Sequence, residues 1–249
     1  MSNNKAFTVI VPFSRPAQSR HIADTLLAQT VRPARLLVCG NGEGVLGLKL
    51  EEGERLAMAG IEVVMLQLPE PNVCRARNSG LDYAAHMGFD WLAFLDDDDH
   101  YLPTYLERIG EYAAPNRIVG SRPHTVVDDR GVFRVHYEPD TGPCEWLSGG
   151  THAFGPDVAK RLRYPIVPFG EDVMFCLLAH QIGIEVYDVG PGEFLYDRRG
   201  APADHAWPRD ARKHLGYFAR TSDLAGELAQ QLTRSGPEAS DKSGDTTNV

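Results

Sequence analysis

Four consecutive aspartates, Asp96 to Asp99, directly follow the apolar run 91–95. The apolar residues predict a short buried strand that ends where the acids begin. Unpaired carboxylates resist burial, because each must either stay neutral or find a cation, so we expect all four at the surface. In open α/β sheets the carboxyl ends of the strands face the ligand crevice. Clustered carboxylate oxygens there suit Mg²⁺ or Mn²⁺, and such an ion suits a diphosphate.

Other interpretations of the acidic run are open on these residues alone. An EF-hand calcium loop would place Glu107 at its twelfth position, but His100 and Tyr101 stand where that loop needs an oxygen ligand and a glycine. A phosphatase of the haloacid dehalogenase type also uses a strand followed by Asp-x-Asp, usually near its N-terminus. The simplest alternative is a solvated acidic turn that caps the following helix.

Length and charge narrow the class of protein. The chain has 249 residues, of which 43% are hydrophobic, enough for the core of one domain or of two fused lobes. A formal net charge of −9 argues against a nucleic-acid partner. It favours a protein that needs a divalent cation before it holds a phosphorylated ligand.

The cysteines and the hydropathy predict the compartment. The four cysteines are widely scattered without a Cys-x-x-Cys pair, which is typical of free thiols in a reducing compartment. We find neither a basic-then-apolar leader nor an apolar run near the ~20 residues of a membrane span. These features predict a cytoplasmic protein with no transmembrane segment, and they leave peripheral association with a membrane open.

Strand and helix patterns alternate four times up to the acidic run, which predicts βαβ units and a largely parallel sheet. Pro12, the turn at Gly40 and Asp96 each follow a strand, so this topology brings them to one edge of the sheet. The strands are expected over 7–11, 36–39, 61–66 and 91–95, and the helices over 17–29, 48–59 and 73–86.

The pattern becomes mixed α+β after the acids, and we place a lobe boundary near residue 121. Residues 1–121 would form a Rossmann-like half, 122–234 a second half, and 235–249 a disordered tail, since that segment lacks apolar residues. Strands are expected over 117–121, 151–154 and 185–189, a hairpin over 125–137, and helices over 102–112, 170–182 and 207–233.

Five short motifs occur in an order that resembles the family 2 inverting glycosyltransferases, which have the GT-A fold. They span about residues 6 to 190. The resemblance implies an α/β fold in which a Rossmann-like nucleotide-binding half is fused to a mixed α+β acceptor half. The motifs are Val9-Ile10-Val11-Pro12, Gln29, Ala76-Arg77-Asn78-Ser79-Gly80, Phe94-Leu95-Asp96-Asp97-Asp98-Asp99 and Gly170-Glu171-Asp172.

The resemblance implies metal-dependent transfer of a sugar from a nucleotide-sugar to an acceptor hydroxyl. Asp98 would be the direct ligand of Mn²⁺ or Mg²⁺, Asp96 would face the ribose or a metal-bound water, and His205 would be a further metal or phosphate ligand. Asp99 would either ligate or cap the next helix. Asp172 would be the general base, near a helix N-terminus whose dipole stabilises its charge. Capping of that helix by Glu171 and Asp172 is the structural alternative.

The residues expected to bind the donor come from the same motifs and the strand ends. Arg77 would reach the base or a phosphate, unless it belongs to a solvated helix face. Trp146 would stack on a sugar or pack in the core. The whole donor set is Pro12, Phe13, Ser14, Arg15, Asn41, Arg77, Asn78, Asp96, Asp97, Trp146, Gly149 and Glu171.

One departure from the family's motifs weakens the prediction of which nucleotide base is bound. The family commonly carries Asp-Asp-Gly-Ser after the second strand, where this chain has Gly40-Asn41-Gly42-Glu43. Asn41 can still hydrogen-bond a base edge, because an amide both donates and accepts. UDP is the expected nucleotide, with dTDP and GDP open. The acceptor would be an unknown carbohydrate, a lipid-linked glycan or a small molecule, and a homodimer is one option for the assembly.

Two other functions fit parts of the sequence. A sugar nucleotidyltransferase would share the sheet and the acidic site, but the turn at 11–16 lacks the glycines typical of such enzymes. A catalytically inactive relative that binds carbohydrate or nucleotide would explain the altered turn at Gly40. The presence of Asp96, Asp98 and Asp172 argues against that second alternative.

Overall fold

The structure is a computed structural model, and it describes residues 5–42, 47–129, 131–167 and 169–199. The helix expected over 207–233, the tail over 235–249 and His205 lie outside these residues. Within the described part, no helix is long and apolar enough to cross a membrane. The predicted cytoplasmic location stays a prediction.

An eight-stranded sheet forms the centre of the molecule, in the order β3-β2-β1-β4-β10-β6-β11-β9. The first four strands along the chain pair in parallel, which confirms the α/β prediction. All seven residues of β1 are buried, because helices cover both faces of the sheet there. These strands are β1 (Phe7–Phe13), β2 (Arg35–Asn41), β3 (Glu62–Leu68) and β4 (Trp91–Phe94).

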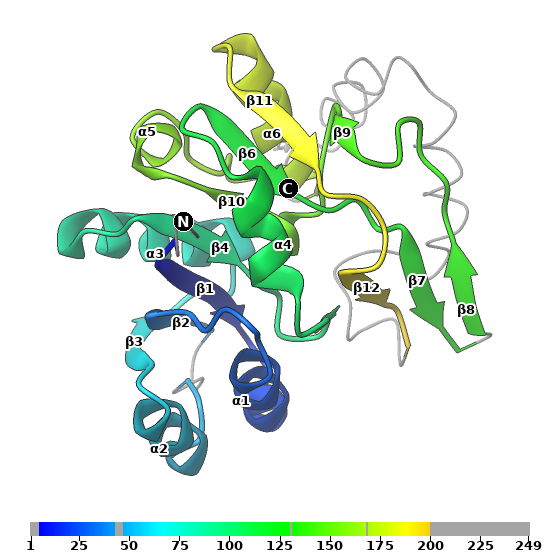
Figure 1. Cartoon of the computed structure of the whole chain (residues 1–249). Helices are drawn as coiled ribbons and strands as arrows, with labels where there is room; N and C mark the ends of the chain where they lie inside the picture. Colours follow the sequence, from blue (N-terminus) through cyan, green and yellow to red (C-terminus); the bar gives the residue numbers. More distant parts are fainter. Residues whose placement is uncertain (1–4, 43–46, 130, 168, 200–249) are drawn as a thin grey trace, which may run out of the picture.

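The helices divide the core into two layers (Figure 1). Helix α3 (Val73–Met87) packs with Ile10, Leu37 and Phe94 on one face of the sheet. On the other face, α1 (Ser19–Leu27), α2 (Leu50–Met58) and α4 (Tyr105–Tyr112) pack with Val9 and Val11. A short 3-10 turn, Pro16–Gln18, leads into α1. The neighbouring residues of β1 therefore point into opposite layers, as the period of a strand requires.

The second half of the chain extends the same sheet. Strand β10 lies antiparallel between β4 and β6, β11 pairs with β6 in parallel, and β9 pairs antiparallel with β11. The boundary proposed near residue 121 thus falls inside a continuous sheet and stays a prediction. The elements are β6 (Arg117–Gly120), β9 (Gly142–Pro143), a 3-10 turn (Gly149–Thr151), β10 (Ala153–Phe154), α5 (Pro156–Ala159), α6 (Glu171–Gln181) and β11 (Glu185–Asp188).

A smaller sheet, in the order β5-β12-β7-β8, stands beside the main one (Figure 1). Its hairpin of β7 (Thr125–Asp128) and β8 (Gly131–Arg134) confirms the predicted hairpin. Strand β5 (His100–Tyr101) pairs with β12 (Phe194–Asp197), and neither strand was predicted. Because His100 and Tyr101 are used in this pairing, the following helix begins at Tyr105 and not at residue 102 as expected.

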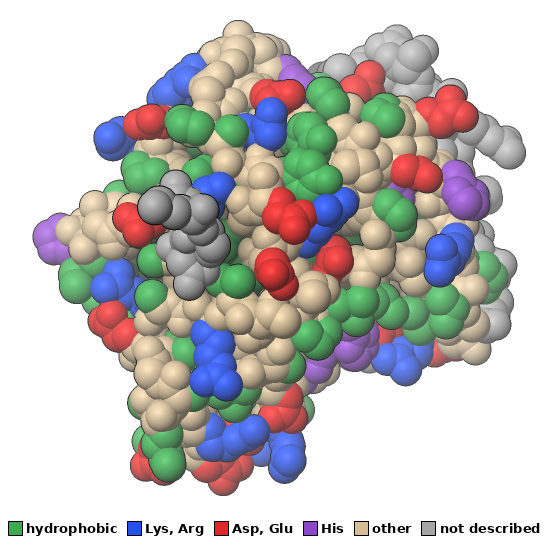
Figure 2. Space-filling view, in the orientation of Figure 1, with side chains coloured by type: hydrophobic (Ala, Val, Ile, Leu, Met, Phe, Trp, Pro, Cys, Tyr) green, Lys and Arg blue, Asp and Glu red, His purple; other side chains and the backbone are tan. Residues whose placement is uncertain are grey.

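The exposed side chains are mixed by type on the face drawn in Figure 2. Acidic, basic and hydrophobic groups alternate there without gathering into one broad basic area. The expectation that the protein has no nucleic-acid partner stays a prediction.

Helix α3 lies very close to β1, which makes Gly80 a sensitive position. A Cβ atom on Gly80 would lie 2.6 Å from Ile10 Cγ2 and 3.1 Å from Cys39 Sγ. We expect Gly80→Ala to lower the free energy of unfolding by about 1–3 kcal/mol, as overpacking of a core does. Urea unfolding followed by circular dichroism measures this.

The matched control is Gly110→Ala in helix α4. There a Cβ would lie 3.8 Å from two ring carbons of Phe7, an ordinary contact. Alanine also favours helix over glycine by about 1 kcal/mol, so this variant should be as stable as the native chain or more so. Equal stability of the two variants would contradict the close approach of α3 to the sheet.

Candidate functional site

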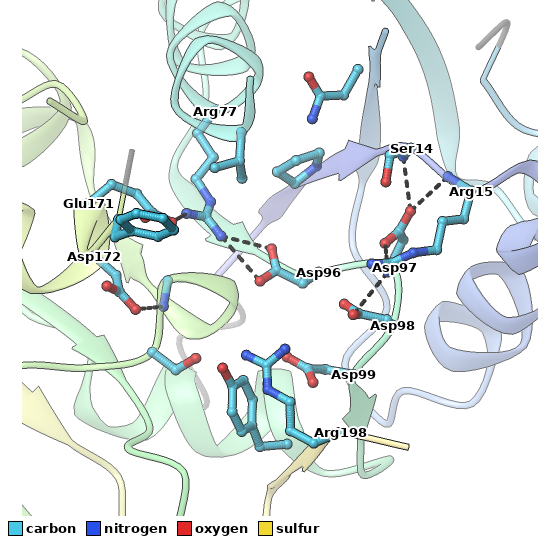
Figure 3. Close-up of a pocket in the computed structure, with 17 residues that line it drawn as sticks. Ser14, Arg15, Arg77, Asp96, Asp97, Asp98, Asp99, Glu171, Asp172 and Arg198 are labelled. Atoms are coloured by element: carbon cyan, nitrogen blue, oxygen red, sulfur yellow. Dashed lines mark hydrogen bonds and ion pairs between the residues drawn. The ribbon is translucent and has the colours of Figure 1, made fainter. Parts of the chain in front are cut away.

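A pocket of about 220 Å³ opens at the carboxyl ends of β1, β2 and β4 (Figure 3). It gathers residues from seven separate parts of the chain, including the N-terminal parts of α3 and α6. This is the edge at which parallel sheets bind ligands. The lining residues are Pro12, Ser14, Arg15, Asn41, Val73, Arg77, Asp96, Asp97, Asp98, Asp99, Ser148, Gly149, Phe169, Glu171, Asp172, Tyr196 and Arg198.

Two of the four acids are buried, which corrects the expectation that all would lie at the surface. Asp97 is 4% exposed and accepts hydrogen bonds from the backbone N–H groups of Ser14 (2.9 Å) and Arg15 (3.1 Å). Asp99 is 2% exposed and accepts one from Asp197 of β12 at 2.9 Å. It does not cap α4, whose N-cap residue is Thr104. The buried carboxylates of Asp97 and Asp99 are thus satisfied by hydrogen-bond donors from distant segments of the chain, which lowers the cost of burying them.

The burial of these two acids raises their pKa values. For Asp97 the pKa rises to about 6, although the Arg15 guanidinium opposes the rise. For Asp99 the pKa lies well above its usual value, because burial and the charges of Asp98 and Asp96 add up. Buried and held by backbone groups, Asp97 and Asp99 shape the site more than they offer free ligand oxygens.

Asp96 and Asp98 are more accessible, with side chains 27% and 21% exposed. Both oxygens of Asp96 accept hydrogen bonds from Nη2 of Arg77, at 2.8 and 3.2 Å. Asp98 Oδ2 lies 2.9 Å from Nη1 of Arg15. The two acids of the Asp-x-Asp motif therefore each have an arginine partner from another element.

Arg77 is buried between two carboxylates, not on a solvated helix face. Its side chain is 2% exposed, and Nη1 donates to Glu171 Oε1 at 2.8 Å while Nη2 binds Asp96. The guanidinium carbon also lies 5.2 Å from the ring centre of Tyr164. The neighbouring Arg75 does lie on the exposed face of this helix, and it pairs with Glu70 at 2.9 Å. Arg77 thus joins the end of β4 to the first turn of α6.

The loop at Gly149 and Gly150 has no room for side chains, because it passes against this ion pair. A Cβ on Gly149 would lie 2.7 Å from Nη1 of Arg77, and one on Gly150 would lie 2.7 Å from Cγ of Asp96. Tyr101 fixes the loop and the acid together: its hydroxyl accepts from the backbone N–H of Asp96 and donates to the carbonyl of Gly150, each at 2.8 Å.

Asp172 lies in the first turn of α6 with both oxygens hydrogen-bonded. Oδ1 accepts from the backbone N–H of Val173 at 2.8 Å, and Oδ2 accepts from that of Gly149 at 3.2 Å. Burial, together with the charge of Glu171, raises its pKa to about 7 despite these bonds and the nearby Arg77. A carboxyl group with that pKa exchanges a proton near neutral pH, as a general base must.

The described residues contain no group of three or more His, Cys, Asp or Glu side chains that could hold a metal alone. Asp96 and Asp98 offer hard carboxylate oxygens at the pocket. Magnesium sites commonly use only one or two carboxylates and complete their shell with substrate phosphates and water. The pocket therefore fits a divalent ion that arrives with a diphosphate, and not a preformed protein cage.

Three residues of the expected donor set lie away from the pocket lining. Phe13 is fully buried in the core. Trp146 is 9% exposed and packs edge-on against Tyr137, so its ring is a core group. Asn78 holds the loop at Tyr164 through two hydrogen bonds of 2.8 and 2.9 Å. The other described members of that set line the pocket, and their role toward a donor stays a prediction.

Two conspicuous lining residues, Arg198 and Phe169, were not among the residues expected to bind the donor or the metal. Arg198 belongs to the segment 196–200, which the sequence suggested as a basic loop over phosphates or a solvated turn. Arg198, just beyond β12, extends its guanidinium toward Asp99 (Figure 3) and lies 3.8 Å from the ring centre of Tyr196. Phe169, next to the Glu171–Asp172 pair in sequence, is 52% exposed. The run of large apolar and aromatic residues Phe194, Leu195 and Tyr196 was the available sequence signal for β12.

No protein-family model matches the chain, and no curated protein matches it. Among solved structures, S. aureus TarS in complex with UDP-GlcNAc is similar at 17% identity and a TM-score of 0.55, over 79% of this chain and 59% of that one. GalNAc-T7 with UDP, GalNAc and Mn²⁺ is similar at 13% identity and a TM-score of 0.56, over 79% and 44%. The mannosyltransferase PcManGT from Pyrobaculum calidifontis, in complex with GDP-Man and Mn²⁺, is similar at 15% identity and a TM-score of 0.56, over 95% of this chain and 66% of that one.

These neighbours are glycosyltransferases of the GT-A type, so the predicted GT-A fold is confirmed. At 13–18% identity the likeness shows the fold alone. The chain spans 60%, 59% and 44% of the length of the first three similar structures. Membership of family 2 stays a resemblance in sequence motifs.

The buried position of Arg77 predicts a large effect of its removal. Arg77→Met leaves Asp96 and Glu171 without their common cation, and breaking such a buried pair typically costs about 3–5 kcal/mol. Because both acids keep some exposure, we expect a loss near 3 kcal/mol in the free energy of unfolding, measured in urea at pH 7. Arg75→Met, on the exposed face of the same helix, should change it by less than about 0.5 kcal/mol. Similar losses in both variants would contradict the bridging role.

Proposed function

We propose that the protein transfers a glycosyl group from a nucleotide-sugar, with UDP as the expected nucleotide, to an acceptor hydroxyl. The reaction would depend on Mn²⁺ or Mg²⁺ and invert the anomeric carbon. The observation that carries the proposal is one pocket that contains both the Asp-x-Asp acids and Asp172, whose pKa is raised to about 7. The GT-A fold and the nucleotide-sugars and Mn²⁺ named for its structural neighbours support it.

The donor would lie along the edge formed by Pro12, Ser14 and Asn41, with its diphosphate toward the acids. Asp98 would hold the metal ion, and Asp96, oriented by Arg77, would complete the site. When bound, the ion would neutralise charge that develops on the leaving diphosphate. Asn41 fits a base edge, and it also accepts a hydrogen bond from the backbone N–H of Asn72, which fixes its orientation.

Asp172 would take the proton from the acceptor hydroxyl. The acceptor oxygen then forms a bond to the anomeric carbon from one face, while the bond to the diphosphate breaks on the other and its electron pair leaves with the phosphate. Stereochemistry inverts in one step, with no covalent intermediate. The neighbouring Glu171 forms an ion pair with Arg77, and its negative charge still contributes to the raised pKa of Asp172.

The experiment that tests the proposal is nucleotide release from UDP-, dTDP- and GDP-sugars, with Mn²⁺, with Mg²⁺ and with chelator. We expect slow release from one donor, lost in chelator and reduced about 10²–10⁴-fold in Asp172→Asn, the usual contribution of a positioned base. Asp157→Asn, an exposed acid in the first turn of α5, is the matched control and should keep full activity.

The outcomes separate two candidate functions. The ion pairs that already occupy Asp96 and Asp98 favour, as a second candidate, an inactive nucleotide- or carbohydrate-binding protein. Metal-dependent binding without release, even when acceptor sugars are supplied, would support that candidate. Neither release nor nucleotide binding across the panel would refute the donor site itself.

The raised pKa of Asp172 predicts the pH dependence of the reaction. The base must be ionised to accept a proton, and below its pKa of about 7 the carboxyl is mostly protonated. We expect kcat to rise about tenfold per pH unit below pH 7 and to level off above it. Steady-state rates at saturating donor between pH 5.5 and 8.5 measure this. A rate that falls as the pH rises through this range would exclude an ionised Asp172 as the base.

A further inference from the structure

Arg15 forms an ion pair with Asp98, the acid expected to be the direct ligand of the metal. Its Nη1 lies 2.8 Å from Asp97 Oδ1 and 2.9 Å from Asp98 Oδ2 (Figure 3). The side chain of Arg15 is 30% exposed and that of Asp98 is 21% exposed, while that of Asp97 is only 5% exposed. Of these two ion pairs, the pair with Asp98 is therefore the one that solvent and ligands can reach.

A divalent ion and the guanidinium compete for the same carboxylate. An ion bound to Asp98 would carry two positive charges to within a few ångströms of Nη1, and like charges at that distance repel strongly in a partly buried site. Asp97 does not need the guanidinium to stay in place, because the backbone N–H groups of Ser14 and Arg15 also bind it. The Arg15 side chain can thus leave Asp98 without releasing Asp97.

The two other pocket arginines are less suited to such a movement. Arg77 is 2% exposed, is fixed at both ends by Asp96 and Glu171, and is packed against Gly149. Arg198 lies over the ring of Tyr196 at 3.8 Å and extends toward the buried Asp99, although its charge also acts on Asp98. Arg15, in contrast, follows β1 at the edge of the pocket, with its own backbone N–H anchored to Asp97 at 3.1 Å.

We propose that Arg15 exchanges partners when the donor binds: it neutralises Asp98 in the free protein, yields Asp98 to the metal, and then pairs with the diphosphate. The ligand recognised in this way is the complex of a divalent metal with a nucleoside diphosphate. The inference rests on the proposed function and adds to it a coupling between metal binding and nucleotide binding. Metal and diphosphate bind cooperatively, because each removes the cost that the other would meet alone.

The test is a set of binding titrations on the full chain, with Mn²⁺ alone, UDP or GDP alone, and Mn²⁺ in the presence of saturating nucleotide. Free Mn²⁺ is followed by electron paramagnetic resonance and nucleotide binding by calorimetry. In the native chain the nucleotide should tighten Mn²⁺ binding at least tenfold. Arg15→Gln should bind Mn²⁺ alone about tenfold more tightly and nucleotide more weakly, as expected when one charge-assisted hydrogen bond is lost. The factor by which nucleotide tightens Mn²⁺ binding should also fall about tenfold in Arg15→Gln.

Two variants serve as controls. Arg15→Lys keeps the charge and should retain most of the competition with Mn²⁺. Arg20→Gln removes an exposed arginine of α1, 78% exposed and paired with Asp24, and should bind both ligands like the native chain. Circular dichroism and thermal melting confirm that each variant is folded. The effect of nucleotide on the Mn²⁺ affinity of the native chain is itself a test that needs no variant.

The results distinguish this inference from the proposed function. If native protein binds the metal–nucleotide complex but nucleotide leaves Mn²⁺ affinity unchanged, or if Arg15→Gln changes neither affinity, the exchange is wrong and the donor site stands. If native protein binds no nucleotide with or without Mn²⁺, the donor site and the exchange are both wrong.

Discussion

The buried guanidinium of Arg77 is the interaction on which the geometry of the pocket depends. It joins Asp96, at the end of a strand of the main sheet, to Glu171, at the start of a helix that lies 94 residues after Arg77 itself. A buried cation of this kind is tolerable only if its partners stay in place. The ion pairs therefore fix the distance between the acids expected to hold the metal and the acid expected to be the base.

Several unrelated features of the sequence follow from this one constraint. Gly149 and Gly150 lack side chains because the loop passes against Arg77 and Asp96. Gly80, about one helical turn beyond Arg77, lets the helix that carries this arginine pack closely against Ile10 and Cys39 of the sheet. The Ala76–Gly80 and Gly170–Asp172 motifs were chosen by resemblance alone, and the structure gives a physical reason why they occur together.

Local pattern was enough to predict the four parallel strands of the first half, most helices and the edge at which the acids meet, but not the short strands β5, β9 and β12. The burial of Asp97 and Asp99 could not be predicted in this way, because their partners Ser14 and Asp197 lie more than eighty residues away in sequence. Arg77 was expected to reach the ligand for the same reason: its spacing on α3 says nothing about a carboxylate on α6. What sequence reasoning lacked was the pairing of distant charges, which decides whether a polar side chain faces a ligand or another part of the protein.

The pKa of Asp172 bears on whether this acid caps a helix or serves the reaction. A capping carboxylate is stabilised by backbone N–H groups and by the helix dipole, so its pKa should fall below the usual value. Asp172 has those hydrogen bonds, yet burial beside Glu171 raises its pKa from 3.8 to about 7. Because the folded state holds this proton more tightly than the unfolded chain, stability falls as the pH rises from about 4 to 7 and stays lower above. The chain therefore keeps, in the lining of its pocket, an acid that costs stability at neutral pH, which fits a proton acceptor better than a helix cap.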